Sequence, residues 1–167
     1  MKVVLDTNCF IHAVNRESRA YKTMQTIFKA SYSGEGTLLV SLHSLHELER
    51  KPDEALALAK SLPLLPHFPI GTWEEQVGTW NQAAGTWEDA KRNEEIRKDL
   101  KKLAKPRADI RDLGVYIDAL FGHADVFVTA DKDLVGKEPS KKIAEKYRLR
   151  VMTPKGLASV ISGRLKL

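Results

Sequence analysis

Four short apolar runs are spaced along this chain, and segments with helical character separate them. The runs are KVVL at 2–5, TLLVS at 37–41, DVFVT at 125–129 and RVMT at 150–153. Apolar runs of this length predict buried strands, and strands that alternate with helices predict a parallel sheet covered by helices. We therefore expect an α/β fold: a three-layer α/β/α sandwich with a mostly parallel central sheet.

The segments between the runs supply the expected helices. Asp6-Thr7-Asn8 offers capping chemistry for a helix directly after the first strand. Further helices are predicted at 19–31, from 42 onwards, and at 53–62, 72–104, 107–122, 139–147 and 154–164. No linker divides the 167 residues, so we expect a single domain over 1–167 with a helical insertion at about 71–105.

Composition excludes several classes of protein. No apolar run approaches the roughly 18 residues of a membrane span. The first residues show no signal-peptide pattern, and the single Cys9 cannot form an internal disulfide. We expect a cytoplasmic protein that does not associate with membranes.

Positive charge is concentrated in one stretch. The formal net charge is +5, and residues 97–107 hold six basic residues and one acid, so this stretch accounts for the whole excess. A basic face of this kind can steer a polyanion such as RNA toward the protein. The alternative is a solvated helix face without a ligand.

The predicted insertion begins with a repeat. Gly-Thr-Trp recurs at 71, 78 and 85, and it contains all three tryptophans of the chain. Seven residues are nearly two helical turns, so the tryptophans share one helix face. This stripe predicts packing against the body of the protein or a second subunit, and the alternative is base stacking on RNA.

Carboxylates occur where the predicted strands end. Asp6 ends the first strand, Glu47 lies shortly after the second and Asp131 follows the third, while Asp112 lies on the helix before the third. Each has an ordinary explanation: a helix cap, a solvated helix residue, a turn, or an ion pair with a nearby arginine. Together they indicate a metal site, because clustered carboxylates repel one another unless a cation neutralises them. Hard oxygen ligands suit Mg²⁺ or Mn²⁺.

These motifs carry a resemblance to a known family. The order VLDTN, then S-x5-E-L from Ser41 to Leu48, then D-x18-D ending in FVTAD resembles the PIN-domain ribonucleases, the family that includes the VapC toxins. The resemblance spans residues 3 to about 153. It implies a parallel sheet with an acidic pocket that binds one or two divalent ions, Mg²⁺ or Mn²⁺, and hydrolyses phosphodiester bonds of single-stranded RNA.

The resemblance also assigns roles to residues. The catalytic and metal-binding acids would be Asp6, Glu47, Asp112 and Asp131, with Asn8 and Thr129 as supporting polar residues. Asp109 and Asp118 stay open as alternatives to Asp112. Residues that could hold the RNA backbone are Arg97, Lys101, Lys105, Arg107, Arg111 and Lys132.

Mechanism and partners follow from the same resemblance. Four ionised carboxylates would repel an RNA phosphate in the absence of metal, and a metal ion held by them would supply positive charge for the phosphate, lower the pKa of a coordinated water and stabilise the leaving oxygen. Products with a 5′-phosphate and a 3′-hydroxyl are implied. The expected partners are the RNA substrate, an antitoxin protein if the chain is a toxin, and a second copy if it dimerises.

Other readings are weaker or stay open. A HAD-type phosphatase needs D-x-D where this chain has Asp6-Thr7-Asn8, and a Cys phosphatase needs C-x5-R where Asn15 follows Cys9. The i, i+3 pair His43 and His46 has no companion pair with zinc-site spacing, which favours histidines of a helix surface or core. The main alternative is a PIN-fold RNA-binding or assembly module with little nuclease activity. Within the enzyme class, toxin and RNA-processing roles both remain open.

Overall fold

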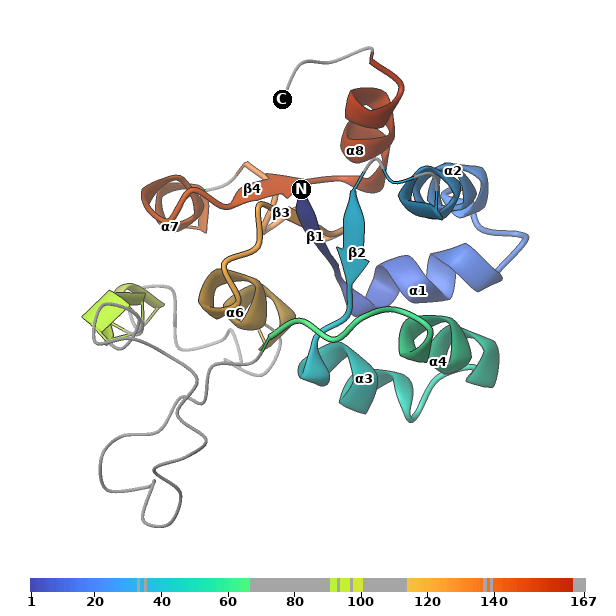
Figure 1. The fold of residues 1–167 in the computed structure, drawn as a ribbon, viewed down its shortest axis with the longest axis horizontal. Coiled ribbons are helices and arrows are strands. Elements are labelled where there is room, and N and C mark those ends of the chain that lie inside the picture. The colour runs from blue at the N-terminus through green and yellow to red at the C-terminus, as the bar shows by residue number, and fades with distance from the viewer. Residues whose placement is uncertain are drawn as a thin grey trace.

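The structure is a computed structural model of the chain, and it describes residues 1–32, 34, 36–66, 91–92, 94–96, 98–100, 114–136, 138 and 140–163. The elements of Figure 1 are β1 (Lys2–Leu5), α1 (Thr7–Val14), α2 (Tyr21–Tyr32), β2 (Thr37–Leu39), α3 (Leu42–Leu48), α4 (Asp53–Lys60), α6 (Gly114–Phe121), β3 (Val126–Val128), α7 (Ser140–Lys146), β4 (Arg150–Met152) and α8 (Pro154–Ile161).

The four strands form one sheet in the order β2-β1-β3-β4, and every pairing is parallel. Val3 of β1 lies opposite Leu38 of β2 on one side and Val126 of β3 on the other, and Val128 of β3 lies opposite Met152 of β4. The predicted α/β class with a mostly parallel sheet is therefore confirmed. The order places β2, β1 and β3 side by side, which decides where the ends of these strands meet.

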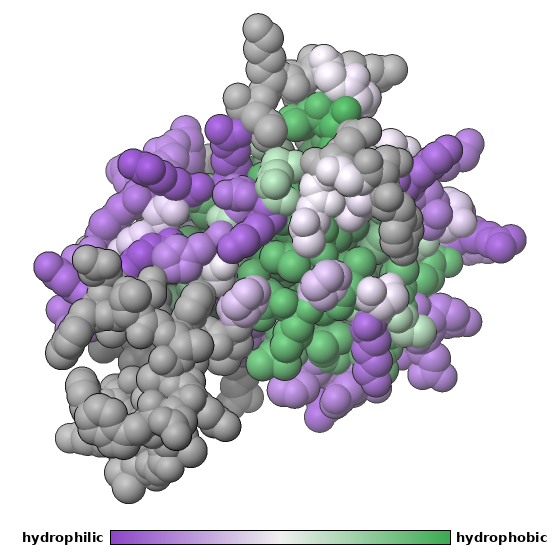
Figure 2. All heavy atoms as spheres, viewed as in Figure 1, coloured by the Kyte–Doolittle hydropathy of each residue, from purple (hydrophilic) through white to green (hydrophobic). Residues whose placement is uncertain are grey.

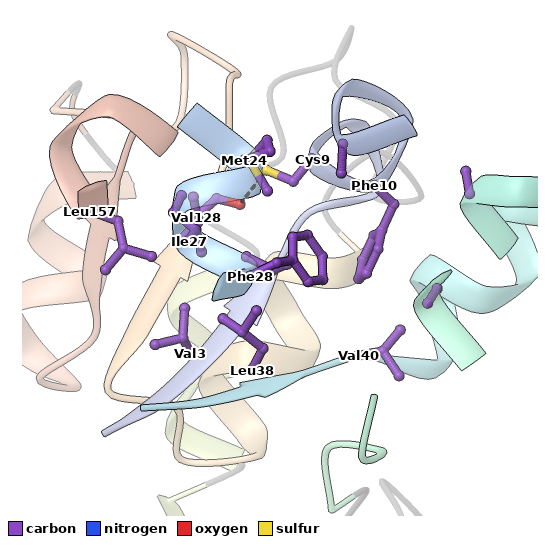
Figure 3. Close-up of a cluster of buried hydrophobic side chains, with 14 of the residues drawn as sticks. Val3, Cys9, Phe10, Met24, Ile27, Phe28, Leu38, Val40, Val128 and Leu157 are labelled. Atoms are coloured by element: carbon purple, nitrogen blue, oxygen red, sulfur yellow. Dashed lines mark hydrogen bonds between the residues drawn. The ribbon is translucent and has the colours of Figure 1, made fainter. Parts of the chain in front are cut away.

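Both faces of the sheet are buried. Alternate residues of each strand point to opposite sides, and apolar strand residues pack into a core on each face. Val3, Leu5 and Val128 belong to a core that includes Phe10 of α1 and Leu157 of α8 (Figure 3). On the other face lies a second core, whose members from the strands, α6, α7 and the segment 91–100 include Val4, Phe127, Leu120, Ile143 and Ile96. The two cores give the predicted three layers: helices, sheet, helices.

Predicted and observed elements agree closely where the structure describes them. The second strand, predicted to reach residue 41, ends at Leu39, and Val40 instead forms an isolated parallel bridge with Leu64. Ser41 is then free to cap α3. The described residues of 91–100 are helical. The remainder of the predicted insertion, including the Gly-Thr-Trp repeat, lies outside the described residues.

The segment 91–100 is attached to the end of α7 by polar contacts. The Asp99 carboxylate accepts hydrogen bonds from Lys146 Nζ at 2.6 Å and from the Tyr147 hydroxyl at 2.9 Å. The guanidinium of Arg92 lies over the Tyr147 ring, 5.5 Å from its centroid. These contacts fix the position of 91–100 against the second core.

The visible surface is unevenly polar. Figure 2 shows apolar side chains gathered over the region where Figure 1 places β2, α1 and α4, with hydrophilic side chains around it. Leu64, which pairs with the residue after β2, is 48% exposed. In the described part of the chain, every helix is too short or too polar to cross a membrane. The predicted homodimer stays a prediction.

Candidate functional site

Three of the predicted acids follow three neighbouring strands. Asp6 comes directly after β1, Asp131 comes three residues after the end of β3, and Glu47 lies on α3, the helix that follows β2. Since the strands are parallel and adjacent in the order β2-β1-β3, their carboxyl ends lie at the same edge of the sheet. Open α/β sheets bind their ligands at this edge.

Asp6 is held at the centre of this edge by its neighbours. It is the N-cap of α1: its Oδ1 accepts a hydrogen bond from the backbone N–H of Thr7 at 2.8 Å. Its Oδ2 accepts a hydrogen bond from the Thr129 hydroxyl at 2.6 Å, and its own N–H donates to the Val128 carbonyl at 2.9 Å. The orientation of the carboxylate is therefore set from both β1 and β3.

Thr129 links two of the acids. Its side chain is fully buried. Its hydroxyl donates a hydrogen bond to Asp6, and the same oxygen accepts a hydrogen bond from the backbone N–H of Asp131 at 3.0 Å. Asp131 Oδ1 in turn accepts a hydrogen bond from the N–H of Asp133 at 2.7 Å, which shapes the turn after β3. The other predicted supporting residue, Asn8, is exposed in the first turn of α1, and Lys132 is exposed beside Asp131.

Glu47 reaches the site through a residue that the sequence did not single out. The hydroxyl of buried Thr7 donates a hydrogen bond to Glu47 Oε2, so the residue after Asp6 connects α1 to α3. The start of α3 is fixed by its cap, because Ser41 Oγ accepts from the N–H of Ser44 at 3.0 Å. The only signal for Thr7 is its place in the DTN motif, where its side chain could equally have faced the core.

The surroundings of Asp6 disfavour its ionised form. The pKa of Asp6 is raised above its ordinary value, first by burial of the carboxylate and further by the negative charges of Glu47 and Asp131. The hydrogen bonds from Thr129 and Thr7 act in the opposite direction but do not cancel these effects. Among the described residues, no positively charged group acts on the pKa of Asp6. A bound cation would stabilise the ionised carboxylate.

The donors fit a hard divalent cation by their chemistry, since three carboxylates offer the oxygen ligands that Mg²⁺ and Mn²⁺ prefer. Among the described residues, however, no group of three or more His, Cys, Asp or Glu side chains is close enough to hold a metal ion as they stand. The predicted fourth acid, Asp112, lies outside the described residues. So do its alternative Asp109 and the candidate RNA contacts Arg97, Lys101, Lys105, Arg107 and Arg111.

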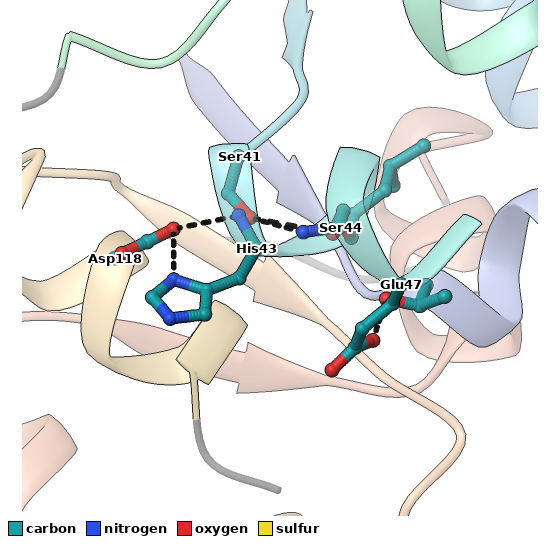
Figure 4. A network of polar contacts seen from close by, with 7 residues as sticks. Ser41, His43, Ser44, Glu47 and Asp118 are labelled. Carbon is teal, nitrogen blue, oxygen red and sulfur yellow. Dashed lines mark hydrogen bonds and ion pairs between the residues drawn. The ribbon is translucent and has the colours of Figure 1, made fainter. Parts of the chain in front are cut away.

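Asp118, the second alternative to Asp112, has a different partner. It is buried in α6, and its Oδ2 accepts a hydrogen bond from Nδ1 of His43 at 2.9 Å (Figure 4). The hydrogen bonds described for Asp118 connect it to His43 and not to Asp6. His43 itself is on the surface of α3, as the absence of zinc-site spacing favoured.

The fold and site thus define an α/β protein with a four-stranded, all-parallel sheet and three acids around one edge of it. No protein-family model matches the chain, and no curated protein shows significant sequence similarity to it.

Proposed function

We propose that the protein is a metal-dependent endoribonuclease of the PIN type, which hydrolyses phosphodiester bonds of single-stranded RNA. The observation that carries this proposal is the geometry of the acids: Thr7 donates hydrogen bonds to both Asp6 and Glu47, and Thr129 connects Asp6 to the backbone of Asp131. Burial first, and then the negative charges of Glu47 and Asp131, raise the pKa of Asp6. A structural N-cap needs one carboxylate and gains nothing from two more that oppose its ionisation.

The residues of the site would divide the work as follows. Asp6, Glu47 and Asp131, with Asp112 as the expected fourth acid, would hold one or two Mg²⁺ or Mn²⁺ ions. Such an ion supplies positive charge for the phosphate and lowers the pKa of a coordinated water. Thr129 holds Asp6 Oδ2 and the backbone of Asp131 in fixed positions. Thr7 does the same for Glu47.

RNA as the substrate is supported by charge and by the resemblance to PIN-domain ribonucleases. The net charge of +5 favours association with a polyanion in spite of the acidic site. A biological role as the toxin of a toxin–antitoxin pair, with a separate antitoxin protein as partner, rests on the resemblance. A role in RNA processing fits the same site equally well.

The alternative function is an RNA-binding or assembly module that keeps the fold with little nuclease activity. One observation favours it: the described carboxylates do not by themselves form a three-ligand group. Under this alternative the hydrogen bonds of Thr7 and Thr129 would serve only to join α1, α3 and β3.

One experiment separates the two functions. Cleavage of single-stranded RNA is measured with Mg²⁺, Mn²⁺ or EDTA for the wild type, Asp6→Asn and a matched control, Asp125→Asn. Asp125 is an exposed aspartate immediately before the amino end of β3, where its carboxylate accepts a hydrogen bond from the N–H of Lys2 at 2.6 Å. The control therefore alters the same residue type at the opposite edge of the sheet.

We expect metal-dependent cleavage by the wild type and Asp125→Asn, and a loss of at least about 100-fold in Asp6→Asn. The expectation follows because even partners of metal ligands are worth about 10- to 100-fold. Wild-type protein that binds RNA without cutting it would support the binding module instead. Equal cleavage by wild type and folded Asp6→Asn would place the activity elsewhere.

A further inference from the structure

His43 is a surface residue that is unusually well fixed. Half of its side chain is exposed, yet its Nδ1 is 2.9 Å from Asp118 Oδ2, and its backbone N–H lies 3.4 Å from the same oxygen. Its ring also rests against Gly114: a Cβ at that position would lie 2.5 Å from His43 Cδ2. Glycine is thus required for this ring position. An exposed side chain that is held in advance loses little entropy when it binds a ligand.

A buried carboxylate such as Asp118 destabilises the fold relative to an apolar residue, so its presence beside a surface histidine needs an explanation. Its side chain is only 2% exposed, and its second oxygen, Oδ1, has no hydrogen-bond partner among the described residues. Burial of a carboxylate with unsatisfied bonding capacity costs stability, and apolar replacements of buried charged pairs are often neutral or stabilising. Apolar side chains could therefore pack α3 against α6 with a smaller loss of stability. The carboxylate has a further effect that an apolar residue cannot supply, which is to fix the imidazole.

The position of His43 connects it to the acidic site. It precedes Glu47 by four residues on α3, a spacing that puts both side chains on one helix face. Figure 4 shows the two side chains on the same side of α3, with Asp118 beyond His43. One helical turn, about 5.4 Å along the axis, separates them. An extended ligand that contacts Glu47 can therefore also reach the imidazole of His43.

The bond to Asp118 determines what the imidazole can recognise. Because the carboxylate accepts a hydrogen bond from Nδ1, the neutral ring carries its proton on Nδ1 and offers the lone pair of Nε2 as an acceptor. A phosphodiester group has no proton to donate to such an acceptor. A ribose hydroxyl has one, and in RNA each nucleotide carries a 2′-hydroxyl beside its phosphate.

We propose that His43 accepts, through Nε2, a hydrogen bond from a ribose 2′-hydroxyl of RNA bound at the acidic site, with Asp118 and Gly114 as the residues that position it. This inference rests on the proposed ribonuclease function. It makes His43 a specificity-determining residue that distinguishes RNA from DNA. The 2′-hydroxyl here is recognised, and it is not the nucleophile of the hydrolysis.

The test combines altered protein with altered substrate. A short single-stranded RNA is prepared with a 2′-deoxynucleotide at each position in turn, and kcat/KM is measured in Mn²⁺ for wild type, His43→Leu and Gly114→Ala. The first variant removes the acceptor. The second displaces the ring and touches no polar group. His46→Leu is the matched control, because His46 is an exposed histidine on the same helix without a described bond to Asp118. Circular dichroism checks that each variant is folded.

We expect one 2′-deoxy position near the cleaved bond to lower kcat/KM of the wild type and His46→Leu by about three- to tenfold, the worth of one neutral hydrogen bond. That penalty should be absent in His43→Leu and Gly114→Ala. Persistence of the full penalty in both variants would overturn the inference. An equal loss on all substrates would overturn it too, since that pattern indicates a phosphate contact.

Failure of the proposed function looks different from failure of this inference. If the wild type cleaves no RNA with metal, the ribonuclease proposal fails, and binding of the RNA and of DNA with the same sequence is then compared by fluorescence anisotropy. A preference for RNA that disappears in His43→Leu would still support the inference. No preference in the wild type, or one that His43→Leu retains, would overturn it.

Discussion

Asp6 and Asp99 are two carboxylates held by hydrogen bonds, but their surroundings differ in charge. Asp99 accepts from Lys146 and Tyr147, and the pKa of Lys146 is raised chiefly by its hydrogen bond to Asp99. Asp6 accepts from neutral donors, and the nearby charges of Glu47 and Asp131 repel its own. The first arrangement is compensated within the chain and attaches the segment 91–100 to the end of α7. In the second arrangement, the negative charge would be compensated by a bound cation.

Apart from loss of the acids themselves, loss of the Thr129 hydroxyl should lower activity more than any other change in the two regions. Thr129→Val removes the donor to Asp6 and the acceptor for the Asp131 N–H while it keeps the shape of the side chain. We expect RNA cleavage to fall by about 10- to 100-fold, as is usual when a partner of a metal ligand is lost. Steady-state cleavage assays on Thr129→Val and Thr129→Ser provide the measurement.

Thr129→Ser is the informative companion, because it retains the hydroxyl and loses a methyl group. Its cleavage should stay within about threefold of the wild type if the hydroxyl matters through its hydrogen bonds. If both variants lose activity to the same extent, packing of the methyl group is responsible, and the bridging role assigned to Thr129 is wrong.

Asp99 should give the opposite result: a loss of stability without a loss of chemistry. Asp99→Asn weakens the bonds that the carboxylate accepts from Lys146 and Tyr147. We expect the free energy of unfolding to fall by about 1–3 kcal/mol, the usual cost of disturbing hydrogen bonds to a buried charge. Urea denaturation measures this, and kcat should remain that of the wild type at a temperature where the variant is folded. A greater effect on kcat than on stability would remove the distinction between the regions.

The pH dependence of stability provides a smaller effect with a definite sign. Because the folded state raises the pKa of Asp6 above 3.8, the folded chain binds this proton more tightly than the unfolded chain. The contribution of Asp6 to stability is thus fully present below pH 3.8 and is lost as pH rises through the folded-state pKa. Metal-free Asp6→Asn lacks this loss.

Above that window, Asp6→Asn should be more stable than the wild type by up to about 2 kcal/mol, the upper end of the usual gain from a single stabilising substitution. The difference should shrink as pH falls toward 3.8. Urea denaturation of both proteins in EDTA at a series of pH values measures it. A variant that is less stable at neutral pH would show that Asp6 serves the fold more than the site.

The strands, and the positions of Asp6, Glu47 and Asp131 after them, could be anticipated because they depend on local patterns; the order of the strands in the sheet was not predicted. Apolar runs predicted the strands, and an acid directly after a strand, such as Asp6, must lie at the carboxyl edge of the sheet whatever else the chain does. Thr129, by contrast, was named only because the resemblance to PIN-domain ribonucleases implies a supporting polar residue there. Even the early end of β2 changed nothing in the placement of Glu47, because α3 begins at Leu42 as the spacing predicted.

Side-chain partners far apart in the sequence could not be anticipated. His43 and Asp118 are separated by 75 residues, and no local pattern of either helix selects one as the partner of the other. Lys146 and Asp99 are 47 residues apart. Asp99 is the one acid in the basic run 97–107, and nothing in that run indicates that it accepts a hydrogen bond from Lys146. Such pairs depend on how helices pack, which charge counts and spacings do not determine.

The central claim is that Asp6, Glu47 and Asp131 form one site for a divalent cation. The most direct test is isothermal titration of Mn²⁺ into the metal-free wild type, Asp6→Asn and Asp99→Asn at neutral pH. We predict that the wild type and Asp99→Asn bind Mn²⁺ with equal affinity and that Asp6→Asn binds it at least about tenfold more weakly. Equal binding by the wild type and Asp6→Asn, or no binding by any of the three, would contradict the claim.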